Sequence, residues 1–201
     1  MTLSGGNPAL LPHMKGLISL LHGEGIVIAV ETQGSKWQDW LTEIDQVTLS
    51  PKPPSSGMTT NGDVLDDIIE KLLRREARSS VSDSRSHSLS HSLSHSLSHS
   101  LSHSLNHSLH SLNNSLSLKV VIFDEIDLSY AKEIHQRYPQ VPMFLQVGNP
   151  DVQRMDIHNH ASELLSRYEE LVDLVMSSSE LNDVRVLPQL HALIWGNKRG
   201  V

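Results

Sequence analysis

The 201-residue sequence contains no cysteine. This absence excludes disulfides, and it excludes zinc or iron–sulfur centres held by cysteine thiolates of these residues. Aromatic residues account for only 4% of the sequence. No apolar run approaches the roughly 20 residues that span a membrane, and the N-terminus lacks the basic and then apolar pattern of a signal peptide. We therefore expect a cytoplasmic protein with no membrane partner.

Positive charge is also scarce. The sequence has 16 Lys and Arg residues against 23 Asp and Glu residues, a formal net charge of −7 with histidine neutral. Proteins that bind nucleic acids without a defined motif depend on Lys and Arg to neutralise phosphates. We therefore expect no nucleic-acid partner.

The segment 79–117 consists almost entirely of Ser, Leu, His and Asn. Within it, His-Ser-Leu-Ser repeats with a period of four. The histidines in register are His87, His91, His95, His99, His103 and His107, with His110 nearby. One interpretation is a polyhistidine metal-binding or metal-storage segment, because imidazoles four residues apart can share a metal. The interpretation we favour is a disordered surface insert, because such a composition buries too little apolar area to offset its ordering entropy.

Outside this insert, short β-branched runs alternate with segments of helical period. We expect strands at 1–4, 26–31, 46–50, 118–123, 143–147 and 184–187. We expect helices at 11–21, with Pro12 in the first turn, and at 37–44, 63–78, 128–138 and 161–175. Alternating strands and helices with continuous apolar strands predict an α/β protein with a parallel sheet. Residues 1–78 and 118–201 are the two predicted parts of this domain.

Polar clusters follow the ends of most of these strands. They are Ser4-Gly5-Gly6, Glu31-Thr32-Gln33-Gly34, Ser50-Pro51-Lys52, Gln146-Val147-Gly148-Asn149 and Gln189-Leu190-His191. The carboxyl ends of parallel strands form the edge at which ligands bind in α/β folds. The alternative is that loops after strands simply collect turn-forming residues.

Six motifs resemble one enzyme family. They are Ser4-Gly5-Gly6-Asn7-Pro8-Ala9-Leu10-Leu11, Glu31-Thr32-Gln33-Gly34, Ser50-Pro51-Lys52-Pro53-Pro54-Ser55-Ser56, Leu118-Lys119-Val120-Val121-Ile122-Phe123, Leu145-Gln146-Val147-Gly148-Asn149 and Val184-Arg185-Val186-Leu187-Pro188-Gln189-Leu190-His191, with the tail from Trp195 to Val201. Together they resemble the 7-carboxy-7-deazaguanine synthases, which are radical S-adenosylmethionine enzymes of queuosine biosynthesis. The resemblance covers nearly the whole chain except the repeat.

The resemblance implies a partial β/α barrel of the radical S-adenosylmethionine type. It implies conversion of 6-carboxy-5,6,7,8-tetrahydropterin to 7-carboxy-7-deazaguanine with loss of ammonia, a carbon–nitrogen lyase reaction. Family members use S-adenosyl-L-methionine, a 4Fe-4S cluster on three cysteines, and Mg2+. They form homodimers and need an electron donor such as flavodoxin.

The resemblance also assigns cofactor contacts. These are Gly5, Gly6, Asn7, Ser50, Pro51, Lys52, Gln146, Val147, Gly148 and Asn149. By this resemblance, the Gly5-Gly6 turn meets the methionine part of the cofactor, where a β-carbon would block the approach. Lys52 would pair with the cofactor carboxylate and Ser50 with a ribose hydroxyl. Asn7 departs from the glutamate common in radical S-adenosylmethionine enzymes, although its amide can still accept a hydrogen bond.

Substrate contacts follow in the same way. They are Ser4, Glu31, Gln189, His191 and the carboxylate of Val201. Simpler roles remain open for several of these residues. For the two glycines and the Ser-Pro-Lys segment, the alternative role is to shape loops. For Glu31 it is that of a helix-start acid, and for His191 that of a core histidine.

The cluster cysteines, the magnesium ligand and the first β/α units of this family are expected upstream of Met1. We therefore interpret the chain as a C-terminal fragment that is truncated at its N-terminus and inactive alone, with no metal site of its own. The first strand would then be an unprotected sheet edge. The alternative is a non-catalytic remnant that binds S-adenosylmethionine or pterin and complements a separate N-terminal piece.

Overall fold

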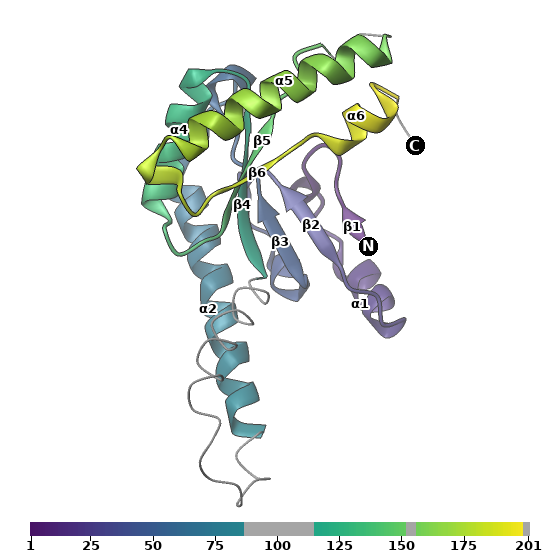
Figure 1. Cartoon of the computed structure of the whole chain (residues 1–201). Coiled ribbons are helices and arrows are strands. Elements are labelled where there is room, and N and C mark those ends of the chain that lie inside the picture. Colours follow the sequence, from purple (N-terminus) through teal and green to yellow (C-terminus); the bar gives the residue numbers. More distant parts are fainter. Residues whose placement is uncertain (87–114, 152–155, 199–201) are drawn as a thin grey trace, which may run out of the picture. The chain divides into compact units, whose positions relative to one another are not determined.

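The computed structural model describes residues 1–86, 115–151 and 156–198, with side-chain surroundings for all of these except 76–86, 157 and 158. The strands are β1 (Thr2–Leu3), β2 (Ala29–Thr32), β3 (Gln46–Leu49), β4 (Leu116–Ile122), β5 (Met143–Val147) and β6 (Arg185–Leu187) (Figure 1). The helices are α1 (Lys15–Gly23), α2 (Gly62–Ser86), α4 (Glu125–Arg137), α5 (Ile157–Met176) and α6 (Leu190–Trp195). Strands and helices alternate and the strands pair in parallel. The predicted α/β class is confirmed, whereas a barrel stays a prediction.

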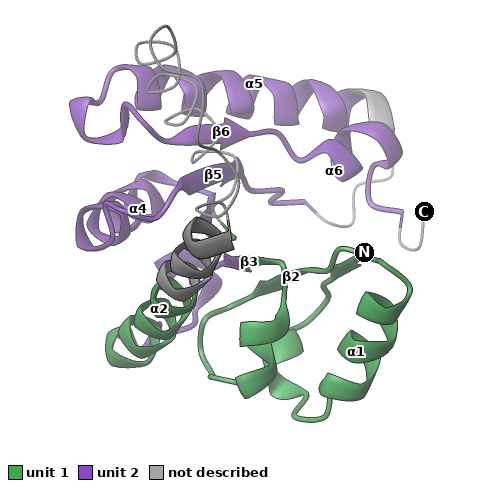
Figure 2. Ribbon diagram, turned by 90° about the horizontal axis from the view of Figure 1, so that it is seen from below, with its two compact units in different colours: residues 1–47, 62–116 green, residues 48–61, 117–201 purple. Residues whose placement is uncertain are grey.

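The chain forms two compact units (Figure 2). Unit 1 comprises residues 1–47 and 62–116, and unit 2 comprises residues 48–61 and 117–201. The unit boundaries fall within β3 and within β4, so each of these strands contributes residues to both units.

Unit 1 contains β1, β2 and the first half of β3, in that order across the sheet. Thr2 pairs with Ala29 and Leu3 with Val30. The apolar stripe predicted for α2 is buried at Leu65, Ile68, Ile69 and Leu72. Because these positions recur every three or four residues, they lie on one face of the helix. This face of α2 therefore contributes four buried side chains to the core of unit 1.

Asp45 fixes the approach to β2. Its carboxyl group accepts hydrogen bonds from the backbone N–H of Ile28 (2.7 Å) and interacts with Nε2 of His22 (3.0 Å). Burial raises the pKa of Asp45, but these hydrogen bonds and the positive charges of His22 and Arg75 lower it by more, to below its ordinary value. The charged form of Asp45 therefore stabilises the folded unit.

We expect Asp45→Asn to make stability less dependent on pH. A lowered folded-state pKa stabilises the fold above the unfolded-state pKa of about 3.9, and this contribution disappears as pH falls through the folded-state pKa. The variant should melt at a lower temperature than the unaltered chain at neutral pH, and this difference should shrink as the pH falls below the unfolded-state pKa. Circular dichroism melting curves measure this difference. Asp173→Asn, at an exposed position of α5, is the control and should show no such shrinking difference. A difference of the same size at neutral and at acidic pH would contradict the prediction.

Unit 2 contains the end of β3 and the strands β4, β5 and β6, in that order. Val120 pairs with Leu145, and Leu145 with Val186. Burial alternates along β4 and β5, so that one face of the sheet is fully buried and the opposite face is half-buried. The buried side chains are Leu118, Val120, Ile122, Met143, Leu145 and Val147. The half-buried positions include Thr48, Ser117, Lys119, Phe144 and Gln146.

Acidic caps determine where two helices of unit 2 begin. A carboxyl oxygen of Asp124 accepts the N–H of Asp127 (2.9 Å), and a carboxyl oxygen of Asp156 accepts the N–H of Asn159 (3.3 Å). Such caps satisfy the free N–H groups of a first turn. Both helices consequently begin earlier than their apolar periodicity predicts.

Three elements near the N-terminus also differ from the prediction. The helix expected at 11–21 begins only at Lys15, after a 3-10 turn η1 (Pro8–Leu10). Leu11 is extended (φ −90°, ψ 111°), because the following Pro12 disfavours a helical conformation there. The helix expected at 37–44 is the 3-10 turn η2 (Asp39–Glu43), and the strand expected at 26–31 is the shorter β2. Helix α6 was not predicted.

The boundaries of the predicted insert also differ. Helix α2 ends at Ser86 and β4 begins at Leu116, both inside the segment 79–117. The repeat from His87 to His110 lies outside the described residues, so the structure tests neither the disordered insert nor the metal-binding segment. Among the helices that are described, none has the combination of length and apolarity that crossing a membrane requires.

Candidate functional site

The glycine turn after β1 adopts the conformation that its sequence predicts. Gly5 and Gly6 have φ values of 99° and 59°, which L side chains rarely adopt. A β-carbon built on either residue would have nothing within 4 Å. The glycines are therefore required by the backbone conformation, and the space beside them is open within unit 1.

Asn7 joins this turn to the end of β2. Its side-chain oxygen Oδ1 accepts a hydrogen bond from the hydroxyl of Thr32 (2.6 Å), and its side-chain nitrogen Nδ2 donates to the hydroxyl of Ser35 (2.9 Å). The predicted cofactor contact therefore already has two protein partners, which give it a structural role. Ser4 is exposed beyond β1, and Glu31 is half-buried on β2 with interactions of its own.

The Ser50-Pro51-Lys52 segment leaves β3 at its carboxyl end in unit 2. Ser50 is only 3% exposed, Pro51 is buried and Lys52 is half-buried. The ammonium group of Lys52 forms no ion pair with any residue that the structure describes. The backbone carbonyl of Lys52 accepts the hydroxyl of Thr60 (3.1 Å). This arrangement holds the backbone in place and leaves one cation for a ligand.

Gly148, at the end of β5, is a site of close packing. Its N–H donates to the carbonyl of Ile122 (2.8 Å). A β-carbon at position 148 would lie 2.6 to 2.7 Å from three ring atoms of Phe123. Contact with Phe123 is therefore sufficient to explain the glycine.

The side chains around Gly148 connect to the C-terminal segment. Gln146 donates to the carbonyl of Pro188 at 3.5 Å, at the limit for a hydrogen bond. Asn149 donates to the side chain of Asn197 (2.8 Å), which in turn donates to the carbonyl of Asp151 (2.9 Å). Val147 is buried in the core. The β5 segment predicted to bind cofactor is thus joined to the chain that follows β6.

The segment after β6 places two predicted substrate contacts. The side-chain oxygen of Gln189 is buried and has no hydrogen-bond partner among the described residues. His191 is exposed, and its Nε2 lies 2.7 Å from the carbonyl of Lys198. It is therefore not a core histidine. Val201 lies outside the described residues, so its carboxylate stays a prediction.

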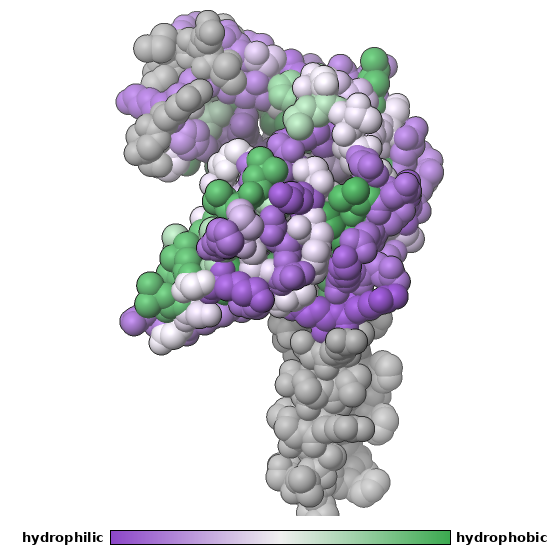
Figure 3. All heavy atoms as spheres, turned by 180° about the vertical axis from the view of Figure 1, so that it is seen from behind, coloured by the Kyte–Doolittle hydropathy of each residue, from purple (hydrophilic) through white to green (hydrophobic). Residues whose placement is uncertain are grey.

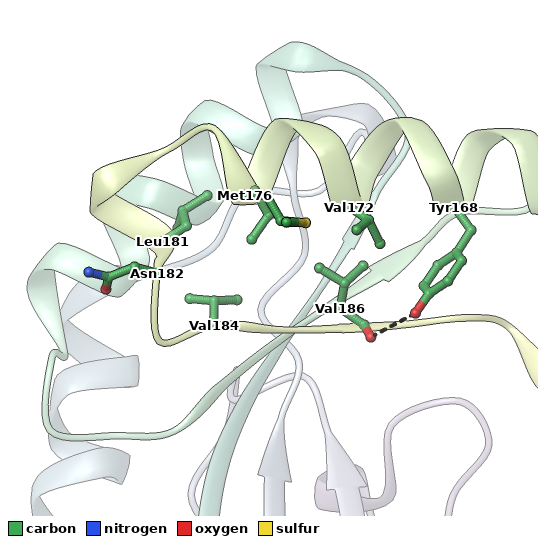
Figure 4. Close-up of a pocket in the computed structure, with 8 residues that line it drawn as sticks. Tyr168, Val172, Met176, Leu181, Asn182, Val184 and Val186 are labelled. Carbon is green, nitrogen blue, oxygen red and sulfur yellow. Dashed lines mark hydrogen bonds between the residues drawn. The ribbon is translucent and has the colours of Figure 1, made fainter.

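A pocket of about 460 Å³ lies elsewhere in unit 2, between α5 and β6 (Figure 4). It is lined by Tyr168, Val172, Val175, Met176, Leu181, Asn182, Val184 and Val186. The hydroxyl of Tyr168 is directed to the carbonyl of Val186 (3.4 Å). None of the predicted site residues lines this pocket, and its lining contains no charged side chain. It does not match the polar ligands that the loops predict.

Apolar surface does not mark the site either. On the face shown in Figure 3, hydrophobic residues form separate patches among hydrophilic ones. Exposed apolar side chains include Met176 (80%), Leu165 (52%) and Leu174 (47%), all on α5.

Within the described part of the chain, no group of three or more His, Cys, Asp or Glu side chains is placed to hold a metal ion.

Sequence reasoning missed four residues that position the loops. Asp127, Tyr130 and Thr60 interact with the segment 50–56 or its neighbours, and Phe123 packs on Gly148. Asp124 and Asp127 stand three residues apart at a helix start, a spacing that indicates a cap. No local signal indicates that Asp127 reaches Ser55, because the two residues are 72 positions apart.

The chain was compared with known proteins. No family model matches it. It is 45% identical to a 7-carboxy-7-deazaguanine synthase of Bacillus cereus and 46% identical to one of Bacillus subtilis. Each alignment covers 201 residues, which are 100% of this chain and 68% of the relative. The similarity covers the whole of this chain, and it therefore includes the motifs at the carboxyl ends of the strands. The chain belongs to the 7-carboxy-7-deazaguanine synthase family.

Proposed function

We propose that the chain acts in queuosine biosynthesis, in the conversion of 6-carboxy-5,6,7,8-tetrahydropterin to 7-carboxy-7-deazaguanine by radical S-adenosylmethionine chemistry. This makes it part of a carbon–nitrogen lyase with a partial β/α barrel. The similarity to two synthases over every residue of the chain carries the proposal. The Ser50–Lys52 loop of unit 2 supports it, because it combines a buried serine with a lysine free of ion pairs among the described residues.

S-adenosylmethionine fits the groups that this loop offers. Lys52 is proposed to bind the carboxylate of the cofactor, which a lysine ammonium recognises as a point charge. Ser50 is proposed to hydrogen-bond a ribose hydroxyl, since a serine hydroxyl both donates and accepts. If a cluster held by residues outside these 201 supplied one electron, the bound cofactor would supply the radical that removes a hydrogen from the substrate. The role of the Gly5-Gly6 turn of unit 1 toward the cofactor stays a prediction.

A pterin fits the free acceptor of Gln189. Burying an amide oxygen without a partner costs free energy, and a ligand N–H removes that cost. Gln189 is therefore proposed to accept a hydrogen bond from an N–H group of the pterin. His191 remains a predicted substrate contact, and its Nε2 faces the carbonyl of Lys198 in this structure. Ser4 and Glu31 of unit 1 remain predicted substrate contacts.

A 4Fe-4S cluster does not fit the residues present. Such clusters are held by cysteine thiolates, and the chain has no cysteine. The described residues also offer no cluster of metal ligands for Mg2+. The proposal therefore assigns to this chain the binding and orientation of cofactor and substrate, with thiolates contributed from outside the 201 residues. Homodimerisation, reduction by a flavodoxin and a cytoplasmic location belong to the same proposal.

The absence of cysteine favours a second candidate function. In it, the chain is a non-catalytic module that binds S-adenosylmethionine or pterin and complements a separate piece. The first candidate requires that the chain bind the cofactor, and the second requires that it bind either the cofactor or the pterin. They differ in whether turnover follows when a cluster-bearing partner is present.

We expect Lys52→Ala to weaken binding of S-adenosylmethionine by about 10- to 100-fold. A hydrogen bond to a charged group contributes about 1.5 to 3 kcal/mol, and each 1.4 kcal/mol changes the dissociation constant about tenfold. Isothermal titration calorimetry of the purified chain measures this change.

Lys132→Ala is the matched control. Lys132 also belongs to unit 2, but its ammonium pairs with Glu180 (3.0 Å) on the turn η5 (Ser179–Leu181). This variant should bind S-adenosylmethionine like the unaltered chain. Equal losses in the two variants would contradict the role of Lys52. No binding of S-adenosylmethionine by the unaltered chain would contradict the first candidate function and the cofactor-binding form of the second.

A further inference from the structure

Helix α4 holds the loop that carries Lys52 at two points. Asp127, in the first turn of α4, accepts the backbone N–H of Ser55 (3.0 Å) and the hydroxyl of Ser55 (2.6 Å). Tyr130, one turn further, donates to the hydroxyl of Thr60 (3.0 Å), and that hydroxyl donates to the carbonyl of Lys52 (3.1 Å). The loop after β3 is thus fixed by side chains of a helix that begins about 70 residues later.

Asp127 is an unusual residue to find in this position. It is completely buried, at 0% exposure, and no basic side chain of the described residues pairs with it. Burying a carboxyl group without a cation is costly unless hydrogen bonds satisfy it. Capping α4 does not require this residue, because Asp124 already accepts the N–H of Asp127. The three donors that reach Asp127 come instead from Ser55 and from the backbone of Phe123 (3.0 Å).

Through Phe123 the same carboxyl group reaches the loop after β5. Phe123 directly follows β4, and its ring fills the space where a β-carbon of residue 148 would stand. Its carbonyl accepts a hydrogen bond from Arg167 of α5 (2.8 Å). Asp127 therefore joins the segments that follow β3 and β4, and the Phe123 ring extends the connection to Gly148.

Tyr130 is suited to remain a hydrogen-bond donor. Burial raises the pKa of its hydroxyl, the bond with Thr60 lowers it, and the charge of Glu133 raises it, with a net shift above the ordinary value. The hydroxyl thus keeps its proton at physiological pH. The Tyr130–Thr60–Lys52 chain of hydrogen bonds then has a fixed direction, from the phenol to the backbone carbonyl.

We propose that Asp127 and Tyr130 are positioning residues that hold the Ser50–Ser56 loop in the conformation that presents Lys52 to the S-adenosylmethionine carboxylate. The inference rests on the proposed function, since it requires the cofactor to bind at this loop. Neither residue touches the cofactor in this proposal. Each holds the loop in one conformation before the cofactor binds, so the loop loses less conformational entropy on binding.

The test compares Asp127→Asn and Tyr130→Phe in the unaltered and the Lys52→Ala backgrounds. Asn retains the size of the side chain but accepts at one oxygen only, and Phe removes a single hydroxyl. Because a net hydrogen bond contributes about 1 kcal/mol, each variant should raise the dissociation constant of S-adenosylmethionine about fivefold. Tyr168→Phe, which loses a hydroxyl bond to Val186 of β6, is the control and should leave binding unchanged.

Coupling distinguishes positioning from a general loss of stability. If the two residues act through Lys52, their effect on affinity should disappear in the Lys52→Ala background. Hydrogen exchange of the free chain should show faster exchange at residues 50–60 in both variants and unchanged exchange in β4 and β5. An unchanged affinity, or an equal loss in both backgrounds, would overturn the positioning role while leaving the proposed function in place. Failure of the unaltered chain to bind S-adenosylmethionine would remove the proposed function, and the positioning role with it.

Discussion

Replacing Trp40 with alanine is expected to lower the free energy of unfolding by about 3–5 kcal/mol. Trp40 is 1% exposed within unit 1, and its indole N–H donates to the carbonyl of Leu11 (2.9 Å). The substitution would open a large cavity and leave that carbonyl without its donor. For a chain of this size the melting temperature should fall by about 6–20 °C, measured by circular dichroism.

Trp195→Ala provides the matched comparison. The same side chain is removed from a position that is 41% exposed, at the end of α6. Less apolar area is lost there and no enclosed cavity forms, so the melting temperature should change by much less than in Trp40→Ala. Similar destabilisation in both variants would contradict the prediction that burial of Trp40 makes a large contribution to the stability of unit 1.

Reconstitution of the purified chain with iron and sulfide is expected to yield no cluster and no cleavage of S-adenosylmethionine. Thiolates are the ligands of such clusters, and these 201 residues contain none. We expect cluster formation and cofactor cleavage to be absent altogether, because no other residue type on the chain replaces three thiolates. Absorption spectroscopy detects the cluster, and chromatography detects the cleaved cofactor.

The Bacillus subtilis 7-carboxy-7-deazaguanine synthase, reconstituted in parallel, serves as the comparison for both measurements. A second reaction combines the chain with the unaligned part of that relative. The alignment covers 68% of the relative, and the unaligned part is the remainder. Cleavage that appears only in the combined reaction would support the lyase proposal over the non-catalytic module. A cluster band and cleavage from the chain alone would contradict the assignment of the thiolates to residues outside it.

Periodicity predicted the elements whose burial is regular. The strand expected at 143–147 matches β5 at both ends, because alternate residues of a buried strand show a clear pattern. Predicted helix ends were less reliable where a cap or a proline determines them, as at Asp124 and Pro12. The cause is that caps act on single N–H groups and leave the apolar pattern unchanged.

Ser50-Pro51-Lys52 could be singled out because its three residues are adjacent in the sequence, and its role in cofactor binding stays a prediction. Residues that act on another loop were not predictable, because their partners are distant in the sequence. The cofactor contacts of Gly148 and Asn7 stay predictions, but the structure adds a packing partner for Gly148, which is Phe123, and hydrogen-bond partners for Asn7, which are Thr32 and Ser35. A local sequence pattern does not indicate these tertiary contacts.

The contact between Phe123 and Gly148 also limits the routes along which this sequence can evolve. A larger residue at position 148 meets the aromatic ring at once, because three ring atoms lie within 2.7 Å of the new β-carbon. A smaller residue at position 123 removes that obstacle, so the same change becomes acceptable after it. The order in which substitutions accumulate therefore matters, and a change at position 123 is expected to precede one at position 148.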